Sequence, residues 1–128
     1  MTGTLYGAAS AKGWQLRLDY ATTEDAAANS STVTADLYVY DATGTSYNQT
    51  PGEAWYQVCG GGQVAQPYSF SVADWYYLGS RTFTAAHASD GSGTVTLTGD
   101  WCSGIDTSAY TPYALSVSGT VTLPVITR

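Results

Sequence analysis

The chain has 128 residues, and its 4 basic and 10 acidic side chains give a formal net charge of −6 at pH 7. At this length one domain buries roughly two thirds of its unfolded surface, so we expect a single domain over residues 1–128. The charge and the lack of a basic cluster argue against a nucleic-acid partner. No apolar run approaches the ~20 residues that span a bilayer, which argues against membrane insertion.

The composition favours β structure, because Thr, Ser, Gly, Val and Tyr are abundant whereas Glu, Lys and Met are scarce. Residues 4–9 are predicted to form a short edge strand. Residues 14–20 alternate apolar and polar side chains, which predicts a second strand. The alanine- and acid-rich residues 22–30 predict a solvated loop or a single helical turn.

Residues 31–41 have the pattern of a central strand, which needs a second sheet to cover its buried face. The inward set is aliphatic, and the outward set is polar and aromatic. These sets are Val33, Ala35, Leu37 and Val39 inward, and Thr34, Asp36, Tyr38 and Tyr40 outward.

The second half of the chain reads as strands separated by turn residues at intervals of about eight to twelve residues. We expect strands in residues 53–58, 63–72, 75–87, 94–101 and 115–123, with turns or loops at 41–44, 47–52, 60–62, 90–93 and 103–112. Roughly eight or nine strands with such spacing predict an antiparallel β-sandwich, either jelly-roll or immunoglobulin-like.

The two cysteines, Cys59 and Cys102, are too few for a disulfide scaffold or a zinc site, but each follows the last large apolar residue of a predicted strand. Two interpretations remain open, a disulfide between them or two buried free thiols. The N-terminus lacks the basic and apolar segments of a secretory signal, so we expect synthesis in a cytosol, which argues against a disulfide.

The carboxylates include Asp36, Glu53, Asp74, Asp100 and Asp106, and no pair among them is singled out by spacing as glycosidase chemistry would require. His87 is the single histidine, and no serine or cysteine lies in a nucleophile signature. We therefore predict that the protein is not an enzyme and that His87 ends its strand and hydrogen-bonds within the 90–93 hairpin.

No loop has the D-x-D-x-D-G calcium pattern, and we predict neither a metal nor a cofactor.

Four stretches carry a family resemblance: GWQLRLDY, TADLYVYDATGTSYNQT, WYYLGSRTFTAAHASDGSGTVTLTGDW and YTPYALSVSGTVTLPVITR. In order and spacing they resemble β-rich modules of siphophage minor structural, baseplate and tail-fibre proteins, a phage family of unknown function. The most specific pieces are W-x-x-L-G-S, H-x-x-D-G and S-V-S-G-T-V-T-L-P. None of them is a catalytic motif.

The resemblance implies a virion component, made in the host cytoplasm, that contacts other virion proteins and forms a homo-oligomer. Polar residues of the Asn or Asp type are usual in that family where this chain has Cys59 and Cys102. This double departure favours a bonded pair, formed outside the cell after lysis. The resemblance supplies no ligand; we predict a tail or baseplate accessory domain that contacts a host cell-surface saccharide. The alternatives are a capsid decoration protein, a purely structural assembly module, or an accessory domain of a cell-wall glycan hydrolase.

Aromatic residues are the most informative class, with 4 Trp and 11 Tyr against 2 Phe. Tyr and Trp carry a polar edge and recur where rings are half wet, at interfaces and sugar-binding surfaces. Trp14 and Trp101 share a phase with aliphatic residues, which predicts core positions. Trp75 and Tyr77, which we expect at a turn, are further candidates for ligand contact.

The predicted ligand platform consists of Tyr38, Tyr40 and Trp55, with Asp36 and Gln57 supplying hydrogen bonds from the same outward phase. These rings have a plain alternative role, which is to cover a second sheet or a neighbouring subunit. A neutral or amine-bearing saccharide suits such a surface, whereas anionic polymers such as teichoic acid are repelled by the net charge of −6.

Overall fold

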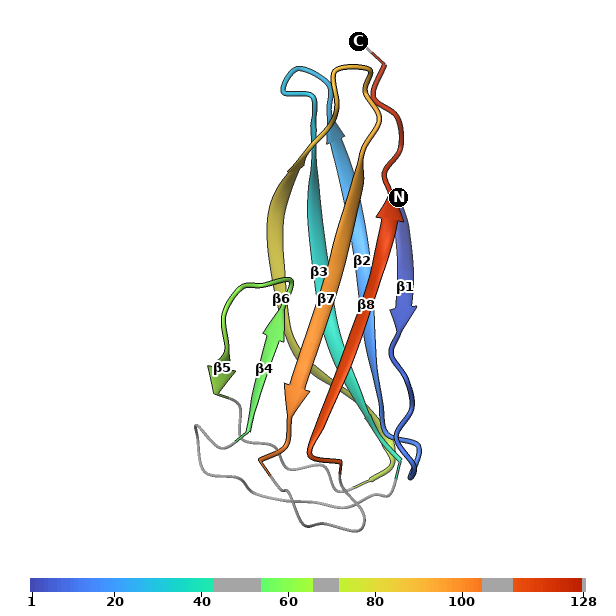
Figure 1. Cartoon of the computed structure of the whole chain (residues 1–128), viewed down its shortest axis with the longest axis vertical. Helices are drawn as coiled ribbons and strands as arrows, with labels where there is room; N and C mark the ends of the chain where they lie inside the picture. The colour runs from blue at the N-terminus through green and yellow to red at the C-terminus, as the bar shows by residue number, and fades with distance from the viewer. Residues whose placement is uncertain (43–53, 66–71, 105–111, 128) are drawn as a thin grey trace.

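The computed structural model describes residues 1–42, 54–65, 72–104 and 112–127. Within these residues the chain has eight strands and no helix, and the strands form two antiparallel sheets of four. The strands are β1 (Thr2–Tyr6), β2 (Gln15–Asp25), β3 (Ser30–Asp41), β4 (Trp55–Val58), β5 (Val64–Ala65), β6 (Asp74–Ala86), β7 (Thr94–Cys102) and β8 (Ala114–Thr122). Figure 1 shows an elongated sandwich, so the predicted all-β class is confirmed.

The first sheet has the strand order β1-β2-β3-β6, and β3 lies between its two longest partners. Its inward residues Val33, Ala35, Leu37 and Val39 are completely buried. The alternation of residues 31–41 therefore marks a central strand, as predicted.

The second sheet, in the order β5-β4-β7-β8, covers the buried face of the first. Trp14 and Trp101 meet between the sheets, both fully buried, with ring centroids 5.7 Å apart and planes inclined by 12°. Their predicted core positions are confirmed. Burial of two side chains of this size adds to the hydrophobic stabilisation that the aliphatic core residues supply.

Residues 22–25 are strand in the structure, where the sequence predicts a loop or a helical turn. The inward phase of β2 continues to Thr22, which pairs with Val33 and is buried, and the ladder runs on to Asp25 opposite Ser30. Asn29 closes the hairpin with a positive φ of 49°, a conformation that Asn tolerates better than most residues. Tertiary pairing thus overrides the weak strand propensity of the acidic residues.

Strand β6 contains a β-bulge at Leu78, because Tyr38 pairs with Tyr77 while Leu37 pairs with Gly79. The extra residue switches the phase of the strand. As a result Tyr77 and Ser80 lie on the same outer face although strict alternation would separate them. Trp75 and Tyr77 are strand residues, as the strand predicted over residues 75–87 requires, and the separate expectation of a turn at these positions is wrong.

The β6–β7 connection is anchored by His87, which follows the last residue of β6. Its Nδ1 donates to the carbonyl oxygen of Gly91 at 2.7 Å, and its Nε2 lies 2.8 Å from the buried hydroxyl of Ser31. The predicted contact of His87 with the 90–93 hairpin is confirmed. Ile126 also donates its N–H to Gly91, so the two sheets are joined at this end (Figure 1).

Cys59 and Cys102 are free thiols, so the disulfide interpretation is wrong. Cys102 pairs with Trp55 at one end of β4, whereas Cys59 follows the other end and its N–H donates to Thr98. Four residues of strand correspond to about 13 Å, far beyond the Cα separation that a disulfide can bridge. Burial raises the pKa of the Cys59 thiol, and a backbone hydrogen bond with Thr98 and the nearby Arg81 offset this only in part.

Several predictions lie outside the described residues. These are most of the turn at 41–44, the stretch 47–52, most of the strand predicted at 63–72, most of the loop at 103–112, and the carboxylates Glu53 and Asp106. In its described part the chain has no helix with the length and apolar character that a membrane crossing requires.

Candidate ligand-binding face

The outer surface of the first sheet carries the largest group of contacting aromatic residues among the described parts of the chain. Cross-strand register aligns one side chain from each of four strands, in the order Tyr6, Arg17, Tyr38 and Tyr77. The neighbouring row adds Tyr40 opposite Trp75. We define the aromatic face as Tyr6, Arg17, Tyr38, Tyr40, Trp75 and Tyr77.

The rings of the aromatic face contact one another in tilted and edge-on geometries. The centroids of Tyr38 and Tyr77 lie 5.4 Å apart at 61°, and those of Tyr40 and Trp75 lie 5.2 Å apart at 51°. Trp75 also approaches Tyr6, from the far edge of the sheet, at 6.2 Å. These separations are those of favourable ring pairs, and they form two groups, Tyr38 with Tyr77 and Trp75 with Tyr40 and Tyr6.

Arg17 lies at the centre of this surface. The guanidinium carbon is 4.3 Å from the ring centroid of Tyr38 and 4.6 Å from that of Trp75, a cation–π contact with each. Its Nε lies 3.2 Å from Asp19, and Asp19 also accepts a 3.0 Å hydrogen bond from the Thr4 hydroxyl. Arg17 is thereby neutralised and holds two rings in place.

Exposure is uneven across the aromatic face. Tyr6 and Tyr77 are 59% and 55% exposed, whereas Tyr38, Tyr40 and Trp75 are half-buried by their neighbours. Tyrosines this exposed contribute little to the core. They are available for contact with another molecule.

The next row on the same surface is polar, with Thr4, Asp19, Asp36 and Ser80 aligned across the sheet. Asp19 and Asp36 are direct cross-strand neighbours, an arrangement that is unfavourable for like charges. Among the described residues, the side chain of Asp36 has no hydrogen-bond or ion-pair partner. A hollow of about 370 Å³ lies over this polar row on the side away from the aromatic face, and Thr4, Asp19 and Asp36 form part of its lining.

The structure does not bring Trp55 and Gln57 to this surface. Their neighbours Ala54 and Val58 are buried, and Tyr56 points to Gly79 of the first sheet, so Trp55 and Gln57 face outward from the second sheet. The predicted platform of Tyr38, Tyr40 and Trp55 is therefore wrong in its third member. Period-2 alternation predicts that a residue faces outward without indicating on which side of a two-layer fold it lies.

Tyr6 and Arg17 of the aromatic face, and Asp19 of the adjacent polar row, are absent from the sequence-based prediction. Arg17 and Asp19 alternate with the buried residues Leu16 and Leu18, and this alternation predicts that both side chains point outward. Their proximity to the tyrosines depends on strand register, which the sequence does not state.

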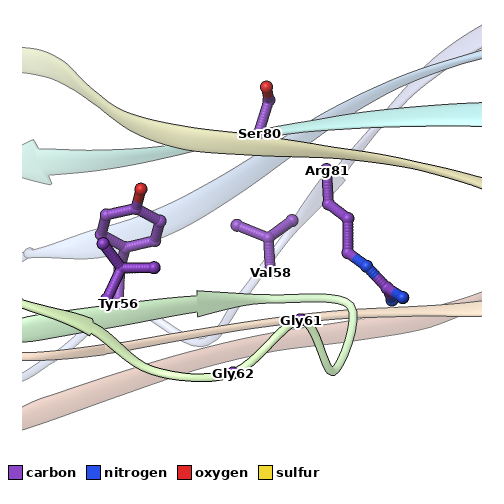
Figure 2. Close-up of a pocket in the computed structure, with 7 residues that line it drawn as sticks. Tyr56, Val58, Gly61, Gly62, Ser80 and Arg81 are labelled. Carbon is purple, nitrogen blue, oxygen red and sulfur yellow. The ribbon is translucent and has the colours of Figure 1, made fainter.

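A second hollow, of about 140 Å³, lies between the β4–β5 hairpin and β6. Figure 2 shows Tyr56 and Val58 directed from β4 toward β6, and Arg81 directed from β6 toward the turn at Gly61. Arg81 donates a hydrogen bond to the carbonyl oxygen of Cys59. Arg81 thus fastens the hairpin turn to the edge of the first sheet, which is a structural role.

The described residues contain no cluster of three or more His, Cys, Asp or Glu side chains that could hold a metal ion. Ser31 and His87 form a serine–histidine contact, but the Ser31 side chain is fully buried and its hydroxyl is inaccessible to a substrate.

The architecture and the aromatic face together define a two-sheet antiparallel β-sandwich with an aromatic outer surface on one sheet. Comparison with protein-family models, curated proteins and solved structures found no match to this chain.

Proposed function

We propose that the protein is a non-catalytic binding module that holds a saccharide against the aromatic face. The observation that carries this proposal is the row of Tyr6, Arg17, Tyr38 and Tyr77, which spans the sheet with a highly exposed tyrosine at each end. Sugar rings present apolar C–H groups of slight positive charge, and these stack on the electron-rich faces of aromatic rings.

The surroundings of the rings also suit a sugar. Sugar hydroxyls need hydrogen-bond partners beside the stacking surface, and Thr4, Asp19, Asp36 and Ser80 form the adjacent row. The face is an open sheet surface, which favours a polymer lying across the strands over a small molecule enclosed in a cavity. The net charge of −6 disfavours polyanionic polymers.

The biological setting that we propose is a phage tail or baseplate, where such a module contacts the host surface. It rests on the resemblance to siphophage structural modules. Labelled protein mixed separately with host cells and with bare capsids distinguishes adhesion from capsid decoration. Binding to capsids in stoichiometric amounts, with none to cells, contradicts the adhesive role.

The proposal is tested by replacing one ring at a time and measuring binding on a glycan array and by titration calorimetry. We expect Tyr77→Ala or Trp75→Ala to lose about 1–3 kcal/mol of binding free energy, roughly 5- to 150-fold in Kd. Trp55→Ala is the matched control, because it removes an outward ring from the opposite sheet. It should bind as the parent does.

Equal binding by the parent and both ring variants contradicts the proposal. If these variants instead change the sedimentation coefficient of the free protein, the rings form an interface between subunits. Circular dichroism of each variant shows whether the fold is retained.

A further inference from the structure

We propose that the aromatic face selects an amine-bearing sugar, with the ammonium group bound by Asp36 while the sugar ring stacks on Tyr38 and Tyr77. This inference rests on the proposed saccharide-binding function and specifies its ligand class. It follows from the distribution of charge on the face and from the position of one carboxylate beside the rings.

The single cation of the aromatic face is not available to a ligand. The Arg17 guanidinium makes cation–π contacts with the rings of Tyr38 and Trp75, and its Nε lies 3.2 Å from Asp19. The side chain is only 21% exposed. An acidic sugar therefore finds no accessible positive charge here. The chemistry of the face excludes uronic acids and phosphorylated polymers as preferred ligands.

Asp36 differs from Asp19 in having no compensating partner. Asp19 interacts with Arg17 and with the Thr4 hydroxyl, whereas Asp36 makes no ion pair or side-chain hydrogen bond in the described structure. Asp36 also lies directly opposite Asp19. A bound cation relieves this repulsion, so the free protein is poised to favour an ammonium ligand over a neutral one.

The distances fit one sugar unit. Asp36 and Tyr38 are two residues apart on β3 and share its outer face, a separation of about 6.6 Å along the strand. An amino substituent on a ring stacked over Tyr38 and Tyr77 thus reaches the carboxylate of Asp36, and the hollow of about 370 Å³ begins on the far side of that carboxylate. The ring of Tyr77, which is exposed and is not contacted by Arg17, attracts the same cation.

The test compares a glucosamine tetramer with an N-acetylglucosamine tetramer, which differ in whether the nitrogen is charged. Calorimetric titrations use the parent, Asp36→Asn and the control Asp100→Asn, whose carboxylate belongs to β7 of the other sheet. We expect the parent and the control to bind the glucosamine tetramer about tenfold more tightly than the acetylated one. Asp36→Asn, which keeps the side-chain shape, should lose this preference and keep its affinity for the acetylated tetramer.

Equal affinity of the parent for the two tetramers, or a preference that survives in Asp36→Asn, overturns the assignment while leaving the proposed function standing. Failure of the parent to bind the glucosamine tetramer overturns the assignment, and failure of the parent to bind any sugar on a glycan array overturns the proposed function as well. A thermal melt of Asp36→Asn accompanies the titrations, so that a folding defect is not read as lost selectivity.

Discussion

Arg17 shows how a single residue sets the properties of a whole surface. The guanidinium group of arginine is planar, so aromatic rings can stack on it. The ammonium group of lysine has no such plane. In this chain the guanidinium contacts Tyr38 and Trp75 and is neutralised by Asp19. Arg17 therefore organises the rings around its guanidinium group. Because Arg17 pairs with Asp19, the neighbouring carboxylate of Asp36 is left as the accessible charge.

At the same scale, Asp36→Asn is expected to stabilise the free protein. The change removes a like-charge pair with Asp19 at constant volume, which should add about 0.2–1 kcal/mol to the free energy of unfolding in urea at pH 7. Asp100→Asn serves as the control because Asp100 pairs with Gln57 and Ser116, neither of which is charged. A loss of stability in Asp36→Asn contradicts an uncompensated charge at this position.

At the scale of elements, the β6–β7 turn depends on the carboxylate of Asp90. It accepts a 2.6 Å hydrogen bond from the Ser92 hydroxyl and a 3.0 Å bond from the Ser92 N–H. These bonds, chiefly the one from the hydroxyl, hold the pKa of Asp90 below its ordinary value of 3.8. Because the folded pKa is depressed, the ionised group stabilises the turn above pH 3.8, and this contribution disappears as the pH falls through the folded pKa.

We therefore expect Asp90→Ala to melt at a lower temperature than the parent at pH 6, with the difference shrinking as the pH falls below about 4. Differential scanning calorimetry across this range measures it. Ser92→Ala deletes one of the two donors and should show a smaller difference with the same pH dependence. A difference that is constant from pH 6 to pH 2 assigns the effect to the turn backbone and contradicts a role for the charge.

At the scale of the whole molecule, the two sheets are held together by a core of aliphatic side chains around one pair of stacked tryptophans. Trp14 and Trp101 stack between the sheets, and Leu16, Leu18 and Leu37 fill the space beside them. A two-layer sandwich has no other means of joining its sheets over most of its length, since the shared backbone hydrogen bonds lie at its edges and ends.

Trp14→Ala is accordingly expected to destabilise the protein by about 3–5 kcal/mol, because it combines lost burial with a cavity between the sheets. Chemical denaturation followed by far-ultraviolet circular dichroism measures this. Trp55→Ala, which removes an outward and half-buried indole, should cost markedly less. Comparable losses for the two variants show that Trp55 belongs to the core and that the assignment of faces is incorrect.

The amino-acid sequence by itself determined the β class, the phase of the long strands and the core tryptophans. It could do so because burial on one face of a strand imposes a period of two, which Trp14, Leu16 and Leu18 or Val33, Ala35 and Leu37 display directly. The same local logic identified the contact of His87 with the turn that follows it.

Only the tertiary structure decided which outward residues meet. Alternation does not show which of the two sheets a strand joins. The sequence-based prediction therefore grouped Trp55 with Tyr38, although they lie on the outer faces of opposite sheets. Alternation also shows neither strand register nor β-bulges. It therefore did not predict the phase switch at Leu78 or the row formed by Tyr6, Arg17, Tyr38 and Tyr77. Spacing along the chain likewise could not show that Cys59 and Cys102 lie at opposite ends of β4. In each case the deciding quantity is a pairing between residues distant in sequence, which the packing of the two sheets selects.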